Sequence, residues 1–304
     1  MSIQSVMVSV DGSRFSETAV PVARQLARTA RASLTIVMAH EMAGVPTAAG
    51  VGESDDRDGQ GIRVLEKTYL AEIALANAHT GGIPVGFRLI EGSPGPALIA
   101  EMDLARPDLL VMSTHGRGVL SRLWLGSVAD YVVRHATQPV LLLPGSANVA
   151  ADCSFRRGLV LMDRTEAAEA VLGPVAEFAA LHQSHLTLMH VLEPEPGALG
   201  MASGESVPPR DSQLGGEYRK AQRYLDGLAH ELRAHGIQVA TRVVVGLGAA
   251  PTILQQIEVG GYDFVAMTTH AGSGMVAPLL GRVADKVIRG AERPVFLVRP
   301  RAAP

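Results

Sequence analysis

The chain contains two copies of one unit, and this duplication constrains the fold more than any other feature of its sequence. When the sequence is compared with itself at an offset of 155 positions, residues 108–142 align with residues 263–297 without a gap, and 15 of the 35 aligned pairs are identical. Composition alone would give about 2 identities over that length. The starts of the copies, VMVSVDGS and GLVLMDRT, also correspond. We therefore expect two domains, over residues 1–146 and 155–301.

Each copy alternates short apolar runs of strand length with segments of helical periodicity. Near-continuous apolar strands separated by helices indicate an α/β fold, in which each tandem domain is doubly wound around a five-stranded parallel sheet with helices on both faces. Ligands of such sheets bind beyond the carboxyl ends of the strands. In the first copy we expect strands at 6–10, 34–39, 85–90, 109–112 and 140–143, helices at 19–30, at 64–79, from 96 and from 126, and a surface insertion at 44–61. The second copy has its own insertion, at 193–216.

Charge and cysteine content exclude several classes of protein. The 27 Lys and Arg residues are outnumbered by 30 Asp and Glu residues, so the chain lacks the basic excess that binds nucleic acid or anionic lipid. Cys153 is the single cysteine and forms neither an internal disulfide nor a Cys-based zinc site. No run of 18 apolar residues is present, and the N-terminus reaches a turn too soon for a signal peptide. We expect a cytoplasmic protein without membrane or nucleic-acid partners.

Polar residues and glycines of the first copy fall at the predicted ligand edge of the sheet. They follow the first strand, follow the fourth strand and open the next helix: Asp11, Gly12 and Ser13; Ser113, His115, Gly116 and Arg117; Gly126 and Ser127. A helix start presents unpaired N–H groups and the positive end of the helix dipole to a phosphate oxygen. Together these residues predict a phosphate cradle, although Gly126 and Ser127 taken alone could be an ordinary helix cap.

The spacing of these residues carries a family resemblance. One motif consists of Ser113-x-x-Gly116, a spacer of nine residues and then Gly126-Ser127. This motif resembles the G-x-x-G-x9-G-[S/T] nucleotide loop of the universal stress protein family. The segments VMVSVDGS, LTIVMAHE and SVADYVVRHATQPVLLLP are similar to that family's first strand, second strand and closing helix with strand. The resemblance spans nearly the whole of both copies, so the chain resembles a tandem universal stress protein.

The resemblance implies an ATP site in the first copy, with Mg²⁺ as an accompanying ion. By this analogy Asp11 faces the ribose and the metal, and the backbone around Ala39 to Glu41 holds adenine. Gly116, Gly126, Ser127 and Val128 meet the phosphates. From its position in the loop, we expect His115 to pack the loop or to line the ligand.

Both copies depart from the family pattern, and the second departs further. In the first copy Ser113 stands where the motif has a glycine, and a serine still offers a backbone N–H and a hydroxyl. In the second copy the matching residues are Thr268, Ala271, Gly281 and Arg282, so two motif glycines and the motif hydroxyl are lost. We expect ATP binding in the first copy and a degenerate motif in the second.

The leading interpretation is an ATP-binding stress-response protein that acts as a nucleotide-dependent sensor or regulatory module. No P-loop, H-E-x-x-H or G-x-S-x-G motif is present, and no catalytic residue is assigned. One alternative is an enzyme of the same architecture that slowly hydrolyses ATP or transfers its adenylyl group. The other is a scaffold that binds no nucleotide.

The last strand of each copy is apolar and follows a proline, so it would leave a bare sheet edge. We expect strands 140–143 and 295–298 to pair, which would make the two copies an intramolecular pseudo-dimer. The intact chain would then be a monomer or a homodimer through another face.

Overall fold

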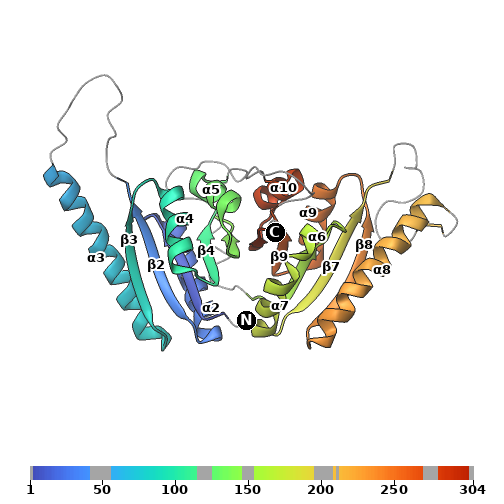
Figure 1. Cartoon of the computed structure of the whole chain (residues 1–304), viewed down its shortest axis with the longest axis horizontal. Coiled ribbons are helices and arrows are strands. Elements are labelled where there is room, and N and C mark those ends of the chain that lie inside the picture. The colour runs from blue at the N-terminus through green and yellow to red at the C-terminus, as the bar shows by residue number, and fades with distance from the viewer. Residues whose placement is uncertain are drawn as a thin grey trace, which may run out of the picture. The chain divides into compact units, whose positions relative to one another are not determined.

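A computed structural model describes residues 3–41, 56–114, 125–145, 154–194, 208–209, 212–269 and 280–300 of the chain. Its described elements confirm the expected α/β fold, with strands and helices alternating in both repeats (Figure 1). The first repeat consists of β1 (Ser5–Val10), α1 (Arg14–Glu17), α2 (Ala19–Ala30), β2 (Ser33–His40), α3 (Asp56–Gly81), β3 (Val85–Glu91), α4 (Pro94–Ala105), β4 (Leu109–Ser113), α5 (Ser127–His135) and β5 (Val140–Leu143).

The second repeat follows the same order of elements. It consists of β6 (Arg157–Leu161), α6 (Glu166–Glu169), α7 (Leu172–His182), β7 (His185–Leu192), α8 (Gln213–Ala234), β8 (Gln238–Val245), α9 (Ala249–Gly260), β9 (Phe264–Thr268), α10 (Arg282–Gly290) and β10 (Val295–Val298). This repetition of element order is the structural counterpart of the sequence duplication.

Strand order places helices on both faces of each sheet. In the first repeat β3, β2, β1 and β4 are neighbours in that order and all parallel, and β5 begins beside β4, where the Leu110 N–H donates to the Pro139 carbonyl at 3.0 Å. In the second repeat the parallel order is β10, β9, β6, β7, β8. Crossovers between parallel strands are right-handed. When the chain changes the direction in which it moves across the sheet, as it does after β3, the next helix therefore lies on the opposite face. Thus α2 and α3 cover one face of the first sheet, and α4 and α5 cover the other.

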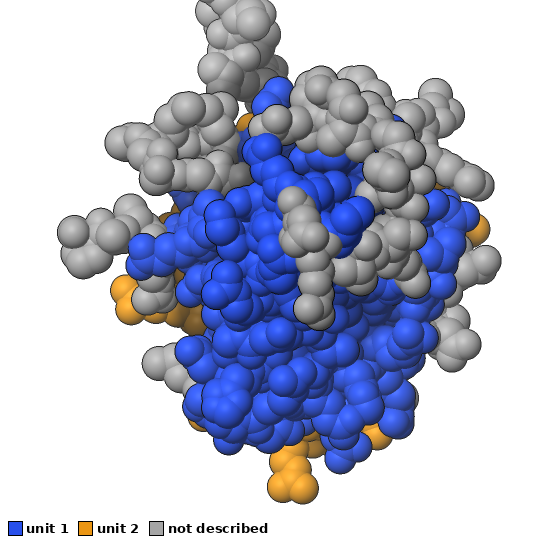
Figure 2. Space-filling model, turned by 90° about the vertical axis from the view of Figure 1, so that its right-hand side faces the viewer, with its two compact units in different colours: residues 1, 121–124, 141–304 blue, residues 2–120, 125–140 orange. Residues whose placement is uncertain are grey.

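The chain divides into two compact units (Figure 2). One comprises residues 2–120 and 125–140, and the other comprises residues 1, 121–124 and 141–304. The division falls inside β5, close to the end of the first sequence repeat. The pairing of strands 140–143 and 295–298 stays a prediction.

Several element boundaries differ from the sequence-based expectation for local reasons. Helix α4 begins at Pro94 rather than at residue 96, because a proline at the first helical position has no N–H to leave unpaired. Helix α3 begins at Asp56, inside the segment expected to be an insertion. Helix α1 was not expected; Ser13 caps it by accepting a hydrogen bond from the Ser16 N–H.

The cores of the two repeats use different side chains at matching positions. In the first repeat Val6 of β1 lies opposite Leu109 of β4, and both are buried. In the second repeat the same register pairs Gly158 with Phe264. A Cβ atom at Gly158 would lie under 3.0 Å from the Phe264 ring and from Leu186. The glycine therefore provides the space that the larger ring occupies.

An aromatic cluster fills the second core. Phe178 lies 5.1–5.3 Å, between ring centroids, from each of Phe155, Phe264 and Phe296. His182 closes one side of the cluster, 4.7 Å from Phe178, and its Nε2 has no hydrogen-bond partner among the described residues. Burial lowers the pKa of His182 to about 4.

The glycine–phenylalanine exchange predicts a non-additive pair of substitutions. Gly158→Val should destabilise the second repeat by about 1–3 kcal/mol through overpacking, and Phe264→Leu by about 1–2 kcal/mol through a cavity. The double variant recreates the pair of the first repeat and should be more stable than the sum of the single effects indicates. Urea unfolding of the four proteins measures this coupling, and strict additivity would contradict the proposed packing.

The half-buried His182, whose Nε2 atom is buried, predicts a pH-dependent loss of stability. The unfolded chain takes up this proton near pH 6.5, but the folded chain takes it up only near pH 4. Between these values the unfolded state binds more protons, so the contribution of His182 is complete above about pH 7 and is lost as the pH falls to about 4. His182→Phe keeps an aromatic ring and should flatten this part of the stability profile. Thermal melting of both proteins from pH 7 to pH 4 is the measurement, and equal slopes would refute the assignment.

Candidate functional site

A partly open cavity of about 100 Å³ lies at the carboxyl edge of the first sheet. The chain winds away from β1 and β4 in opposite directions, which leaves a crevice between the ends of these neighbouring strands. The cavity is lined by the strand ends and by the helices that follow them: Ser9, Val10, Asp11, Ser16, Val37, Ala39, Ile90, Pro94, Leu98, Met112, Ser113, Thr114, Gly126, Val128 and Ala129.

The turn after β1 is fixed by its own hydrogen bonds. The Ser13 N–H donates to Asp11 Oδ1 at 2.9 Å, and Gly12 between them has a φ of 77°, which favours glycine. The Asp11 N–H donates to Ser16 Oγ at 3.0 Å, and the Ser16 hydroxyl donates to the Ser13 carbonyl at 2.9 Å. These bonds hold the Asp11 carboxylate, which is partly exposed, at the edge of the cavity.

The other side of the cavity is built where β4 approaches the start of α5. The Gly126 N–H donates to the Thr114 carbonyl at 2.8 Å, which fixes the helix start beside the end of β4. A Cβ atom at Gly126 would lie 3.2 Å from that carbonyl oxygen, so glycine permits this close approach. Gly126 makes no side-chain cap for α5. Within the described residues, the N-cap therefore gives the first N–H groups of this helix no side-chain acceptor, a setting that suits an anion.

The structure brings together five residues that the sequence selected: Asp11, Ala39, Ser113, Gly126 and Val128 all line the cavity. Gly12 and Ser13 build the turn beside it, and Ser127 is exposed at the start of α5. His115, Gly116 and Arg117 lie outside the described residues.

Most of the apolar wall of the cavity and two of its hydroxyl-bearing residues were not predicted from the sequence. Val37 and Leu98 are buried and Ile90 is half-buried at the wall, and Ser16 and Thr114 also line the cavity. Val37 and Ile90 lie near the carboxyl ends of the second and third predicted strands, so an analysis extended to every strand end would have included them. Ser16 belongs to the unexpected helix α1.

His40 lies close to this wall and has a structural partner. Its buried ring Nδ1 is 2.6 Å from a carboxylate oxygen of Glu66, which joins the end of β2 to α3. The His40 carbonyl accepts the Gly92 N–H at 3.1 Å, which closes the neighbouring strand end. His40 therefore holds the end of β2 in place.

The second repeat keeps the front turn but changes its chemistry. The Thr165 N–H donates to Asp163 Oδ1 at 3.0 Å, and Arg164 between them has a φ of 66°, so this turn keeps its shape without glycine. The Arg164 guanidinium pairs with Glu217 at 3.2 Å. Burial lowers the pKa of His190, whose Nδ1–H donates to the Met162 carbonyl at 2.7 Å.

A carboxylate of the chain itself lies at a helix N-terminus of the second repeat. Glu193 Oε1 accepts the Ala249 N–H of α9 at 2.8 Å. Pro94 of the first repeat matches Ala249, has no N–H and lines the cavity, and Glu41 of the first repeat matches Glu193. At the start of α10, Arg282 follows Gly281 and replaces the serine of the first repeat. The two repeats therefore differ in both charge and space at matching positions.

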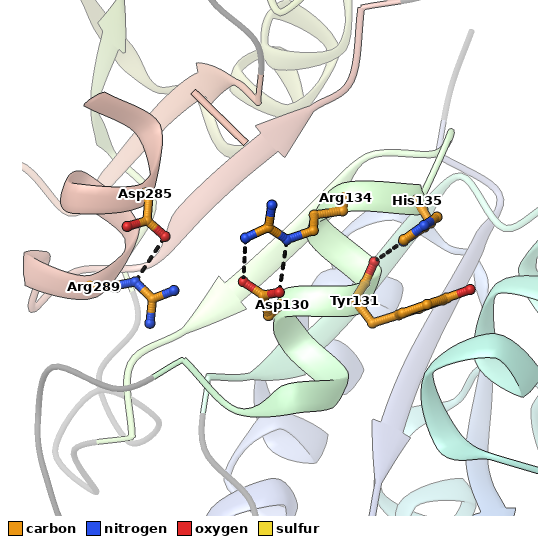
Figure 3. Close-up of polar contacts among 6 residues, drawn as sticks. All are labelled: Asp130, Tyr131, Arg134, His135, Asp285 and Arg289. Atoms are coloured by element: carbon orange, nitrogen blue, oxygen red, sulfur yellow. Dashed lines mark hydrogen bonds and ion pairs between the residues drawn. The ribbon is translucent and has the colours of Figure 1, made fainter. Parts of the chain in front are cut away.

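Helices α5 and α10 also share a purely structural feature (Figure 3). Each carries an aspartate–arginine pair one turn apart, Asp130 with Arg134 and Asp285 with Arg289, at 2.8 Å. In α5 the His135 ring stacks on Tyr131, with 4.0 Å between ring centroids. Because both repeats keep the acidic–basic pair, we assign it to helix stability rather than to a ligand.

The described residues lack two other features. They contain no group of three or more His, Cys, Asp or Glu side chains placed to hold a metal ion. Within the same ranges, no helix is long and apolar enough to cross a membrane.

Comparison with known proteins gives a consistent result. The sequence model of the universal stress protein family matches twice, over residues 2–144 and 154–299. A universal stress protein of Mycolicibacterium smegmatis is 25% identical over 97% of both chains, and one from Thermus aquaticus is 30% identical over 46% of this chain and 98% of its own. The crystal structure of a universal stress protein from Archaeoglobus fulgidus covers 99% of this chain and 100% of its own, with a TM-score of 0.74 at 17% identity, which shows a shared fold.

Proposed function

Since the chain belongs to the universal stress protein family, we propose that its first repeat binds ATP and that the protein acts as a nucleotide-dependent sensor or regulatory module in a stress response. One observation carries the proposal: a single cavity brings together Asp11, Ser113, Gly126 and Val128 from three separate segments of the first repeat. A polar edge and an apolar wall meet there, as a nucleotide requires.

The residues present fit the parts of ATP. The start of α5 offers N–H groups and the helix dipole to phosphate, worth up to about 2 kcal/mol in a partly buried site. Gly126 keeps this approach open, since a Cβ atom there would already crowd the Thr114 carbonyl at 3.2 Å. Val37, Ile90 and Leu98 supply apolar contact for the base. Mg²⁺ bound with the nucleotide would neutralise phosphate charge, and Asp11 would hold it.

The same reasoning makes the second repeat a poor site. Arg164 of its front turn is engaged by Glu217 at 3.2 Å, and the Glu193 carboxylate accepts an N–H at the start of α9. The side chain of Arg282 adds bulk at the start of α10, the helix start that matches the proposed phosphate site of the first repeat. We therefore assign the second repeat a mainly structural role.

The cavity favours holding ATP over cleaving it. Rapid phosphoryl transfer needs an oriented nucleophile and concentrated positive charge on the transferred group. The described lining residues include neither Lys nor Arg. A fast kinase or ATPase is the less favoured function on this ground.

The asymmetry of the two sites can be tested with one substitution made twice. Gly126→Arg should abolish ATP binding, since the new side chain fills the start of α5 beside Thr114. Gly281→Arg changes the matching helix cap of the second repeat and is the control for any general damage. Isothermal titration of the wild-type protein should give one site per chain, lost in Gly126→Arg and kept in Gly281→Arg. Two equivalent sites per chain would contradict the asymmetry.

A second experiment separates a binding module from an enzyme. ATP that binds only the folded state should raise the melting temperature, with about 2.7 kcal/mol of stabilisation when its concentration is 100 times Kd. Phosphate release should stay near background over the same range. Turnover of about 1 per second or faster, lost in Asp11→Ala, would establish the enzyme instead. No effect of ATP on melting, and none on titration, would support the nucleotide-free scaffold.

A further inference from the structure

Helix α3 of the first repeat exposes large apolar side chains in its second and later turns. The exposed fractions are 48% for Ile62, 63% for Val64, 70% for Leu65 and 60% for Leu75. The opposite face of the helix packs on the sheet through Leu70 and other buried residues, as its position against β2 and β3 shows (Figure 1). The exposed apolar side chains therefore contribute nothing to the core of the repeat.

The second repeat shows that the fold does not require this apolar surface. At an offset of 155 positions, Ile62, Val64, Leu65 and Leu75 correspond to Glu217, Arg219, Lys220 and His230 of α8. Helix α8 covers its own sheet with an ordinary polar outer face. Since one architecture tolerates both surfaces, the apolar side chains of α3 indicate a contact that α8 does not make.

The exposed residues of α3 repeat at coiled-coil spacing. Leu65, Thr68, Glu72 and Leu75 are separated by three, four and three residues, so they form a single stripe along the helix. Thr68 and Glu72 are also exposed. Lys67 is exposed at the edge of the stripe, and neither Lys67 nor Glu72 forms an ion pair within the described residues.

The stripe is complementary to a second copy of itself running in the opposite direction. A two-fold axis beside residue 70 would set Leu65 of one copy against Leu75 of the other, at both ends of the contact. The same axis would set Thr68, whose hydroxyl donates to the Val64 carbonyl of its own helix at 2.8 Å, against Glu72. It would also bring Lys67 of one copy to the level of Glu72 of the other. Two copies of the helix thus place leucine against leucine at both ends of the contact, and a positive charge near a negative one.

We propose that α3 is a self-association surface, on which a second copy of this chain docks its own α3 in antiparallel orientation. The stripe from Leu65 to Leu75 is about 15 Å long, so the contact is smaller than that of an obligate dimer, and the dimer is reversible. The proposal does not depend on nucleotide binding.

Sedimentation velocity of the full chain over a concentration series tests the proposal. The wild-type protein should dimerise, and Leu65→Lys and Val64→Arg should each weaken dimerisation at least tenfold. Both substitutions introduce the residues that α8 carries at the same helical positions, so the fold accommodates them. The control is Leu104→Lys on α4, which alters another leucine of the same repeat that is 77% exposed and should leave dimerisation unchanged.

A charge exchange identifies the antiparallel arrangement. Lys67→Glu and Glu72→Lys should each weaken the dimer, and the double variant, with its charges exchanged, should restore it. A wild-type protein that stays monomeric at all concentrations would overturn the proposal. A dimer that survives Leu65→Lys would also overturn it, as would a double variant that dimerises more weakly than both single variants. Far-UV circular dichroism confirms that each variant is folded.

Discussion

The pairing of β1 with β4 is the constraint on which the candidate site depends. Val6, Met7 and Val8 lie opposite Leu109, Leu110 and Val111, and from this pair of strands the chain winds in opposite directions. The reversal leaves the ends of β1 and β4 uncovered by a crossover, and so creates the crevice in which Asp11 and Ser113 meet. Any sequence that forms this strand order obtains the crevice. The side chains at its edge then decide what it binds.

The duplication separates residues that serve the fold from residues that serve one repeat. Both repeats share three features: the turn after the first strand, a hydrogen bond from a tyrosine to a glutamate, and the aspartate–arginine pair. The tyrosine bonds are Tyr69 to Glu17 and Tyr224 to Glu169. Their persistence is explained by structure alone. The start of α5 and the outer face of α3 occur in one repeat only, and these are the places where a ligand and a partner are proposed.

The sequence predicted the fold well, because apolar periodicity and the internal repeat are properties of the chain itself. Strand 140–143 was predicted at its observed bounds, and α2 at its observed length. Short helices such as α1 escaped prediction, since one turn capped by Ser13 has no periodic signal. The exchange of Val6 and Leu109 for Gly158 and Phe264 was equally hidden, because neither residue of each pair indicates its partner until the strand register is known.

The candidate site was predictable only where a motif or a strand end marked it. Asp11 and Gly126 could be selected because a turn follows one and a helix follows the other. Glu193 could not, since its effect depends on reaching the first N–H of α9, far along the chain, at 2.8 Å. That contact shows how matching helix starts of the two repeats differ while the fold is kept. The carboxylate bonds to the first N–H of α9, whereas the matching helix α4 begins with Pro94, which has no N–H to offer. The start of α10, which matches the proposed phosphate site at α5, is changed by Arg282 instead.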